Sequence, residues 1–197
     1  MKSKQIHIIE TAMSLFAKQG INAVTMDEIS IKCEVSKKTI YEYFINKSAL
    51  IENVVKHLLN EIERYIRVWP SISPNAISEI RYYFQYVEVN VLTISPMFYH
   101  DLIQYSSAYS LFLQFTDEKL YAFLMQNIVR GQAENIYRSN TELIIKVHLW
   151  FIKKIISDVS FQVEVDRINF FSCSNDAFLR SLLNNNGQKM ALKKDVF

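Results

Sequence analysis

The chain has 197 residues, half of them hydrophobic, with three glycines, three prolines and a formal net charge of +2. This length can bury a sizeable core, and no charge run or low-complexity stretch indicates disorder. Sheet folds need many tight turns, which glycine and proline usually make, so the composition favours helices joined by short connections over a β-rich fold.

The first predicted helix lies near the N-terminus. Ile6, Ile9, Met13 and Phe16 recur at intervals of three and four residues, which is one apolar face of a helix. Gly20 follows, and a glycine just past the last turn commonly ends a helix. We therefore expect a helix that ends before Gly20.

A second helix is predicted to start after Thr25. The segment from Thr25 to Glu28 fits a capping box, in which the threonine caps the helix and the glutamate reaches back to it. Met26, Ile29 and Cys33 form its inner face, so Cys33 is interpreted as a small core residue rather than a redox sensor.

The third predicted helix begins after Ser36, another residue that favours the N-cap position. Since it follows the second helix so closely, the two must cross steeply, which is the helix-turn-helix arrangement. Ile40 and Phe44 point to the core, and the opposite side can donate to phosphates and read base edges in a major groove. The outward side chains are Lys38, Thr39, Tyr41 and Glu42. Glu42 fits either an acceptor for a cytosine amino group or a solvent-facing charge.

A fourth helix is predicted to begin near Lys47 and to run to about residue 69, where Pro70 and Pro74 end it. A lysine at a helix start opposes the helix dipole, and a neighbouring phosphate would reverse that penalty. A merely solvated lysine fits the spacing equally well. The charge surplus of the chain lies in the first fifty residues, which is weak evidence for a polyanionic partner.

These segments resemble the tetracycline-repressor (TetR) family. The resemblance covers about residues 5–55 and rests on residues 16–20, 25–30 and 35–44, with Asn46, Lys47 and Leu50 after them. It implies an all-helical homodimer in which the first three helices bind double-stranded DNA at a near-palindromic operator. The fourth helix would connect them to a ligand-binding and dimerising body.

The resemblance also implies roles for individual residues. Thr25 would contact phosphate, Tyr41 and Tyr43 would touch the DNA backbone, and Lys47 would meet a phosphate at the start of the fourth helix. The recognition helix would open with Ser36, Lys37, Lys38 and Thr39. Two positions depart from the family pattern, since Glu34 and Lys38 stand where glycine is common. Glu34 is therefore expected to hold a left-handed backbone conformation at a cost of about 1 kcal/mol.

Long helices are predicted in the rest of the chain. An apolar stripe runs along residues 77–91, and Ser95 and Pro96 start a short helix that ends near residue 106. A further helix covers about residues 111–132 and is interrupted near Thr116 and Asp117. Two last helices lie near 140–159 and 166–184, and the polar, basic end from 184 to 197 is expected to fray.

The last two helices are apolar enough to form a four-helix dimer interface, or simply to complete the core of one chain. Spacing alone leaves these alternatives open, and the family resemblance favours dimerisation. The residues predicted at the interface are Phe151, Ile155, Phe171, Phe178 and Leu182.

The body is rich in aromatic residues, and helices packed around large rings often enclose an apolar pocket. The functional interpretation is a site for a hydrophobic or aromatic effector, and the alternative is that the rings fill the core. The residues predicted to line a pocket are Phe84, Phe98, Tyr105, Phe112 and Tyr121.

No pattern of catalytic or metal-binding residues stands out, so we expect neither an enzyme nor a bound metal or cofactor. His100 and His148 are isolated and do not form a metal cluster with Cys173. Two cysteines are too few for a disulfide framework, and the most apolar stretch, residues 143–156, is too short and too charged to span a bilayer. We therefore expect a soluble cytoplasmic protein without a membrane partner.

The sequence thus predicts an all-α protein of about nine helices with two domains. Residues 1–46 would form the helix-turn-helix DNA-binding domain, and residues 47–197 the effector-binding and dimerisation domain. The predicted function is a transcriptional regulator, with a repressor released from its operator by a small effector as the leading hypothesis. The alternative is a DNA-binding dimer that is controlled by a protein partner or has no effector.

Overall fold

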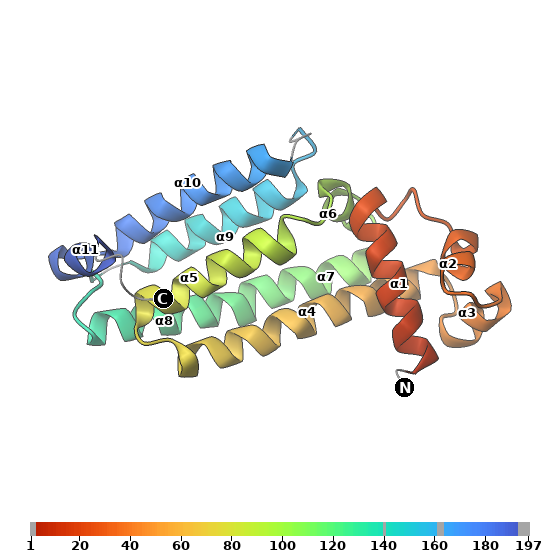
Figure 1. The fold of residues 1–197 in the computed structure, drawn as a ribbon, viewed down its shortest axis with the longest axis horizontal. Helices are drawn as coiled ribbons and strands as arrows, with labels where there is room; N and C mark the ends of the chain where they lie inside the picture. The colour runs from red at the N-terminus through yellow and green to blue at the C-terminus, as the bar shows by residue number, and fades with distance from the viewer. Residues whose placement is uncertain (1–2, 140, 161–163, 193–197) are drawn as a thin grey trace.

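The computed structural model describes residues 3–139, 141–160 and 164–192, and these residues confirm the expected all-α fold. Figure 1 shows an elongated molecule with the three N-terminal helices at one end and a bundle of helices from the rest of the chain beside them. Among the described residues, β pairing is limited to one isolated bridge between Tyr137 and Leu183. No helix in this part of the chain combines the length and apolar character needed to cross a bilayer.

The N-terminal helices are α1 (Lys4–Gln19), α2 (Met26–Lys32) and α3 (Lys37–Tyr43). The predicted capping box is present, because the Thr25 side chain accepts from the Glu28 N–H while Glu28 accepts from the Thr25 N–H. The predicted Ser36 cap is also confirmed, since its Oγ accepts from the Thr39 N–H at 3.0 Å. Buried side chains shared by the three helices include Ile9, Phe16, Ile29, Cys33, Ile40 and Phe44.

The long helix α4 (Lys47–Ile72) runs through Pro70, so the prediction that Pro70 ends it is wrong. Pro70 lies in the last turn, where the missing N–H costs a single hydrogen bond to the turn before it. Arg130 then donates to the carbonyl oxygens of Pro70 and Ser73, at 3.1 and 2.8 Å. These bonds satisfy carbonyl groups that a helix end leaves without an internal partner.

The body continues with α5 (Ala76–Tyr86), α6 (Pro96–Leu102), α7 (Ser106–Gln114), α8 (Tyr121–Ala133), α9 (Glu142–Ser157) and α10 (Glu164–Leu182). A π-helical turn, η1 (Val87–Val91), follows α5, and a second, η2 (Phe115–Leu120), joins α7 to α8. The η2 turn confirms the predicted interruption near Thr116 and Asp117. α4 packs along α7, α5 along α8, and α9 along α10 (Figure 1).

The C-terminal segment corrects another expectation. Residues 185–192 form helix α11 (Asn185–Leu192) instead of fraying, and residues 193–197 lie outside the described residues. Asn184 explains the order, because its Oδ1 accepts from the N–H groups of Asn186 and Gly187 while its Nδ2 donates to the Asn135 carbonyl. The polar residues that suggested fraying therefore cap and anchor a helix. The proposed domain boundary coincides with the start of α4 and stays a prediction.

Candidate nucleic-acid interface

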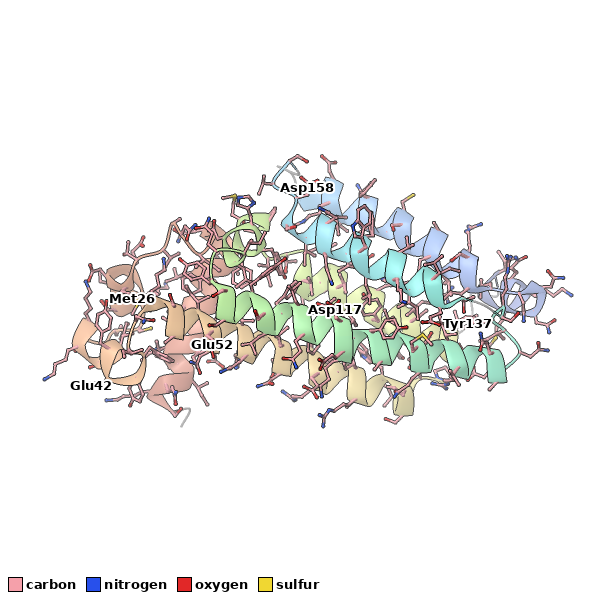
Figure 2. The ribbon with its side chains drawn as sticks, turned by 180° about the vertical axis from the view of Figure 1, so that it is seen from behind. Met26, Glu42, Glu52, Asp117, Tyr137 and Asp158 are labelled. Carbon is pink, nitrogen blue, oxygen red and sulfur yellow. The ribbon has the colours of Figure 1, made fainter. Side chains whose placement is uncertain are left out.

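The turn between α2 and α3 fixes the direction of α3. Glu34 has a φ of 56°, the left-handed conformation expected at this position. The Val35 N–H returns to the Ser30 carbonyl at 3.1 Å, which closes the turn. With Ile40 fully buried beneath it, α3 holds one fixed face against the core and exposes the other. Figure 2 shows Glu42 at the extreme end of the molecule, on this exposed face.

The predicted DNA-contacting residues fall into two groups. Lys38, Tyr41, Glu42 and Tyr43 are exposed on α3, and among the described residues their side chains make no hydrogen bond or ion pair. The remaining side chains already have partners within the chain. Thr25 and Ser36 serve as helix caps, and the Thr39 hydroxyl lies 2.9 Å from Ser36 Oγ. The free group thus offers one cation, one carboxylate and two phenols to a ligand.

Lys37 forms an exposed ion pair with Asp27 of α2. Its Nζ lies 2.8 Å from Asp27 Oδ1, and the hydrogen bond to Asp27 raises the pKa of the lysine. Exposed pairs of this kind contribute little to stability. A phosphate can therefore compete with Asp27 for this ammonium group, at the cost of the existing pair.

Lys47 is turned inward rather than merely solvated, and its contact with a phosphate stays a prediction. Its Nζ donates to the Ile21 carbonyl at 2.7 Å and lies 5.9 Å from the centroid of the Phe16 ring. Burial lowers the pKa of Lys47, while the carboxylates of Asp101 and Glu28 act in the opposite direction. A phosphate contact by Lys47 would require this ammonium group to share or leave its carbonyl partner.

Sequence reasoning missed the contact that joins this unit to the body. Asn22, in the loop between α1 and α2, is bound by Asp101 of α6 through both its backbone N–H and its side-chain amide, at 2.8 and 3.0 Å. The Tyr105 hydroxyl donates to Asn22 Oδ1 at 2.9 Å, and the Ser95 N–H donates to the Ala17 carbonyl at 2.7 Å. We call Asn22, Asp101 and Tyr105 the interdomain latch. The first two lie 79 residues apart, so spacing gave no signal of it.

The five residues predicted to line an effector pocket are not brought to one cavity. Phe98 is buried in the core, and Tyr105 belongs to the interdomain latch. Phe112 borders a cavity of about 30 Å³ with Tyr99 and Tyr109. Phe84 lines a separate groove on α5, and Tyr121 donates to Glu142 at 2.9 Å.

The residues predicted at a dimer interface lie mostly inside the single chain. Ile155, Phe171, Phe178 and Leu182 are buried, and Phe151 is half-buried with its ring 5.5 Å from that of Phe170. These four side chains pack within the single chain, and their role in a dimer interface stays a prediction. The apolar side chains that α9 and α10 do expose are Leu143, Val147, Trp150 and Phe170.

The two histidines that the sequence singled out lie apart. His100 is exposed, whereas His148 is buried with its Nε2 3.2 Å from the Tyr83 hydroxyl. Within the described ranges, no group of three or more histidine, cysteine or carboxylate side chains could hold a metal ion.

Comparison with known proteins places the similarity mainly in the N-terminal unit. Residues 8–54 match the family of bacterial regulatory proteins described as the tetR family. The uncharacterized HTH-type transcriptional regulator YuxN of Bacillus subtilis is 42% identical over 57 residues, which cover 29% of this chain and 20% of YuxN. The Tn10 TetC protein of Escherichia coli is 31% identical over 99 residues, which cover 49% of this chain and 50% of TetC. The chain thus spans a fifth to a half of these relatives.

Solved structures share the whole fold at low sequence identity. A TetR transcription regulator from Haloarcula marismortui superposes with a TM-score of 0.76 at 14% identity, over 92% of this chain and 98% of the other. A transcriptional regulator from Saccharomonospora viridis, solved in complex with choline, gives a TM-score of 0.74 at 15% identity, with the same coverage of 92% and 98%. At this identity, the likeness extends to the fold alone.

Proposed function

We propose that the protein is a regulator of the TetR family, whose family model matches residues 8–54, and that it acts as a dimeric repressor whose α3 enters the major groove of its operator. The observation that carries this proposal is the exposed face of α3, where the side chains of Lys38, Tyr41, Glu42 and Tyr43 make no hydrogen bond or ion pair within the described residues. Phenols and ammonium groups donate to phosphates, and lysine or glutamate can read base edges. The protein would act in the cytoplasm, because that is where its operator DNA lies.

Dimerisation would set the distance between the two α3 helices that contact DNA. Two recognition helices about 34 Å apart reach successive major grooves, so the operator is a near-palindrome with half-sites one helical turn apart. The proposed interface is the exposed apolar stripe of α9, formed by Leu143, Val147 and Trp150, together with Phe170 of α10. A two-fold axis would bring the same stripe of both copies together and cover it.

Release by a small effector completes the proposal. The Saccharomonospora viridis neighbour is described in complex with choline, which supports a ligand-binding role for a body of this fold. An effector would act by binding the DNA-free arrangement more tightly than the DNA-bound one. The interdomain latch offers a physical route, because Asp101 of α6 holds the α1–α2 loop directly.

A second candidate is a DNA-binding dimer controlled by a protein partner or without any effector. It is favoured by the spread of the predicted pocket residues, because Phe112 borders only a cavity of about 30 Å³ while Phe98 and Tyr105 are engaged in the core and in the contact to Asn22. A thermal-shift screen separates the candidates. A compound that both raises the melting temperature and releases DNA supports the effector-controlled repressor, whereas a compound set that does neither supports the second candidate.

The test of DNA recognition is selection of bound sequences from random duplexes, followed by salt titration of the best site. We expect paired half-sites with about 10 base pairs between their centres. Lys38→Ala should weaken binding and lower the salt slope by about one, because it removes a free cation. Lys37→Ala is the matched control and should lower the slope less, since Asp27 already neutralises that lysine. The absence of any sequence-preferring binding would overturn the proposed function.

A further inference from the structure

A groove of about 380 Å³ runs along the outer face of α5. Its volume falls within the range of small-molecule sites, and its wall combines aromatic rings with a few polar groups. The residues that line it are Pro74, Ser78, Arg81, Tyr82, Phe84, Gln85 and Glu88. The groove is far larger than the cavity beside Phe112, and its residue Phe84 also contacts the aromatic rings of the core.

Two opposite charges stand at separate points of this groove. Arg81 makes a hydrogen bond of 3.4 Å to the Ala191 carbonyl, and no ion pair of Arg81 or Glu88 occurs among the described residues. Partial burial raises the pKa of the Glu88 carboxyl. Seven residues separate these groups, a rise of about 10 Å along the helix, so they do not neutralise each other. The rim of the groove can therefore hold polar substituents of a ligand.

Phe84 is the wall between the groove and the core. Its ring lies 5.9 Å from the ring of His148, and 6.5 and 6.0 Å from the rings of Phe171 and Phe178. His148 in turn stacks on Phe178 with a centroid distance of 4.1 Å. A molecule that reached past Phe84 would thus meet aromatic faces from α5, α9 and α10.

Polar atoms without a partner lie on the core side of this wall. Asn175 of α10 is buried, and both its Oδ1 and its Nδ2 lack a hydrogen bond. By helical spacing it occupies the same face of α10 as Phe171 and Phe178, the two residues that contact Phe84. His148 Nδ1 also lacks a partner, while Nε2 faces the Tyr83 hydroxyl. Unpaired buried polar groups are costly and rare in native proteins, so both need an explanation.

We propose that an effector enters the α5 groove, displaces the Phe84 ring and so reaches Asn175, and that it is a flat aromatic molecule with an adjacent acceptor and donor, as in an aromatic carboxamide. Asn175 Nδ2 would donate to the carbonyl of the ligand, and Oδ1 would accept from its N–H. The ring of the ligand would take the place that Phe84 holds against Phe178. This inference rests on the proposed effector-controlled repressor and specifies its ligand.

A ligand bound at Phe84 would also affect the helices on which DNA binding depends. Displacing Phe84 changes the packing of α5 on α10, the helix that carries part of the proposed dimer interface. α5 is also tied to the end of α4, because Glu79 of α5 binds Arg130, which donates to the Pro70 carbonyl. A ligand that prefers the displaced arrangement of Phe84 would therefore shift the dimer geometry.

The test uses the full-length protein and benzamide as the probe, with acetophenone as a matched compound that keeps the ring and the carbonyl but lacks the N–H donor. Binding is followed by saturation-transfer NMR with titration. We expect wild type to bind benzamide at least tenfold more tightly than acetophenone. Asn175→Leu should lose at least tenfold in benzamide affinity, and Ser172→Ala, an exposed change on the same helix, should bind as wild type does.

The stability of Asn175→Leu separates a ligand group from a structural one. Since the amide has no partner in the structure, the variant should melt no lower than wild type without ligand. A fall of several degrees, equal binding of both compounds, unchanged binding by Asn175→Leu, or no binding by wild type would each overturn the inference. DNA binding is measured separately in a mobility-shift assay. Sequence-specific binding together with failure of the benzamide test removes this inference and leaves the proposed repressor in place.

Discussion

Asn22 and Asp101 join the N-terminal helices to the body through two hydrogen bonds, from the Asn22 N–H to Asp101 Oδ2 at 2.8 Å and from Asn22 Nδ2 to Oδ1 at 3.0 Å. The carboxylate is buried, and its direct partners here are neutral. Gly20 allows this close approach, because a Cβ at this position would lie 2.9 Å from Met97 Cβ and 3.0 Å from Asp101 Oδ2. The loop between α1 and α2 is thus fitted to α6.

Removing the carboxylate should loosen this connection. Asp101→Ala leaves two Asn22 donors without their acceptor, and a loss of about 1–3 kcal/mol in the free energy of unfolding is expected. The measurement is urea denaturation of the full chain. Gln104→Ala is the control, because its contact to Asn22 is exposed and longer, at 3.3 Å. If both variants lost the same free energy of unfolding, Asp101 would contribute no more to this contact than Gln104 does.

Arg130 forms a second long-range connection, and its removal should be more damaging. It pairs with Glu79 at 2.6 Å, and Glu79 is only 1% exposed. Arg130→Met leaves that carboxylate buried without its cation, so a loss of about 3–5 kcal/mol is expected. Glu79→Gln in the same background should recover part of the loss, which urea denaturation would measure.

The matched control for Arg130 is Arg64→Met, which breaks an exposed pair with Glu61. Such a pair contributes at most about 1 kcal/mol, so this variant should unfold close to wild type. If Arg130→Met were as mild as Arg64→Met, the buried pair would not hold α4, α5 and α8 together.

The sequence predicted the N-terminal unit well because its signals are local. The caps at Thr25 and Ser36 each join residues three positions apart, and threonine and serine favour the N-cap position. The left-handed Glu34 was expected from the family resemblance, because glycine is common at that position. α4 shows the opposite case. It continues through Pro70, whose carbonyl accepts a hydrogen bond from Arg130, sixty residues later, and no local pattern indicates that partner.

In the body, apolar periodicity did not identify which helix faces are exposed and which face the core. α9 is apolar on two sides, with Ile152 and Ile155 buried while Val147 and Trp150 are exposed. Periodicity identifies both stripes but not which one faces the core of its own chain. The predicted dimer residues were taken from the buried stripe for this reason. The aromatic residues predicted to line one pocket likewise lie at several separate places in the fold, and the sequence pattern does not indicate where each ring packs.

The exposed stripe of α9 leads to a prediction about assembly. Trp150 is 61% exposed, and Trp150→Glu would place a carboxylate from each copy inside the proposed interface. We expect this variant to be monomeric at micromolar concentrations in sedimentation or light-scattering measurements, because charges are depleted from interface cores. Val129→Glu, at a comparably exposed position on α8, should leave the dimer intact. A dimer that persists in Trp150→Glu would exclude this stripe as the interface.

The buried His148 makes stability depend on pH. Burial lowers the pKa of His148 from 6.5 to about 3. Between these values the unfolded chain binds a proton that the folded chain does not, so stability is lost as pH falls from about 6.5 towards 3, by about 1.4 kcal/mol per pH unit. The surrounding Tyr83, Phe84 and Phe178 bring no charge that would offset this effect.

His148→Leu isolates this contribution from the titration of carboxylates. Urea denaturation of wild type and variant between pH 7 and pH 4 should give free energies that diverge below about pH 6.5, with wild type losing more. His100→Gln, a change at an exposed histidine, should follow the wild-type curve. Parallel curves for wild type and His148→Leu would mean that His148 has the same pKa in the folded and the unfolded chain. Below about pH 6.5 the folded protein would then hold an imidazolium beside Phe84 whose Nδ1–H is free to donate, which would favour an anionic ligand over a carboxamide.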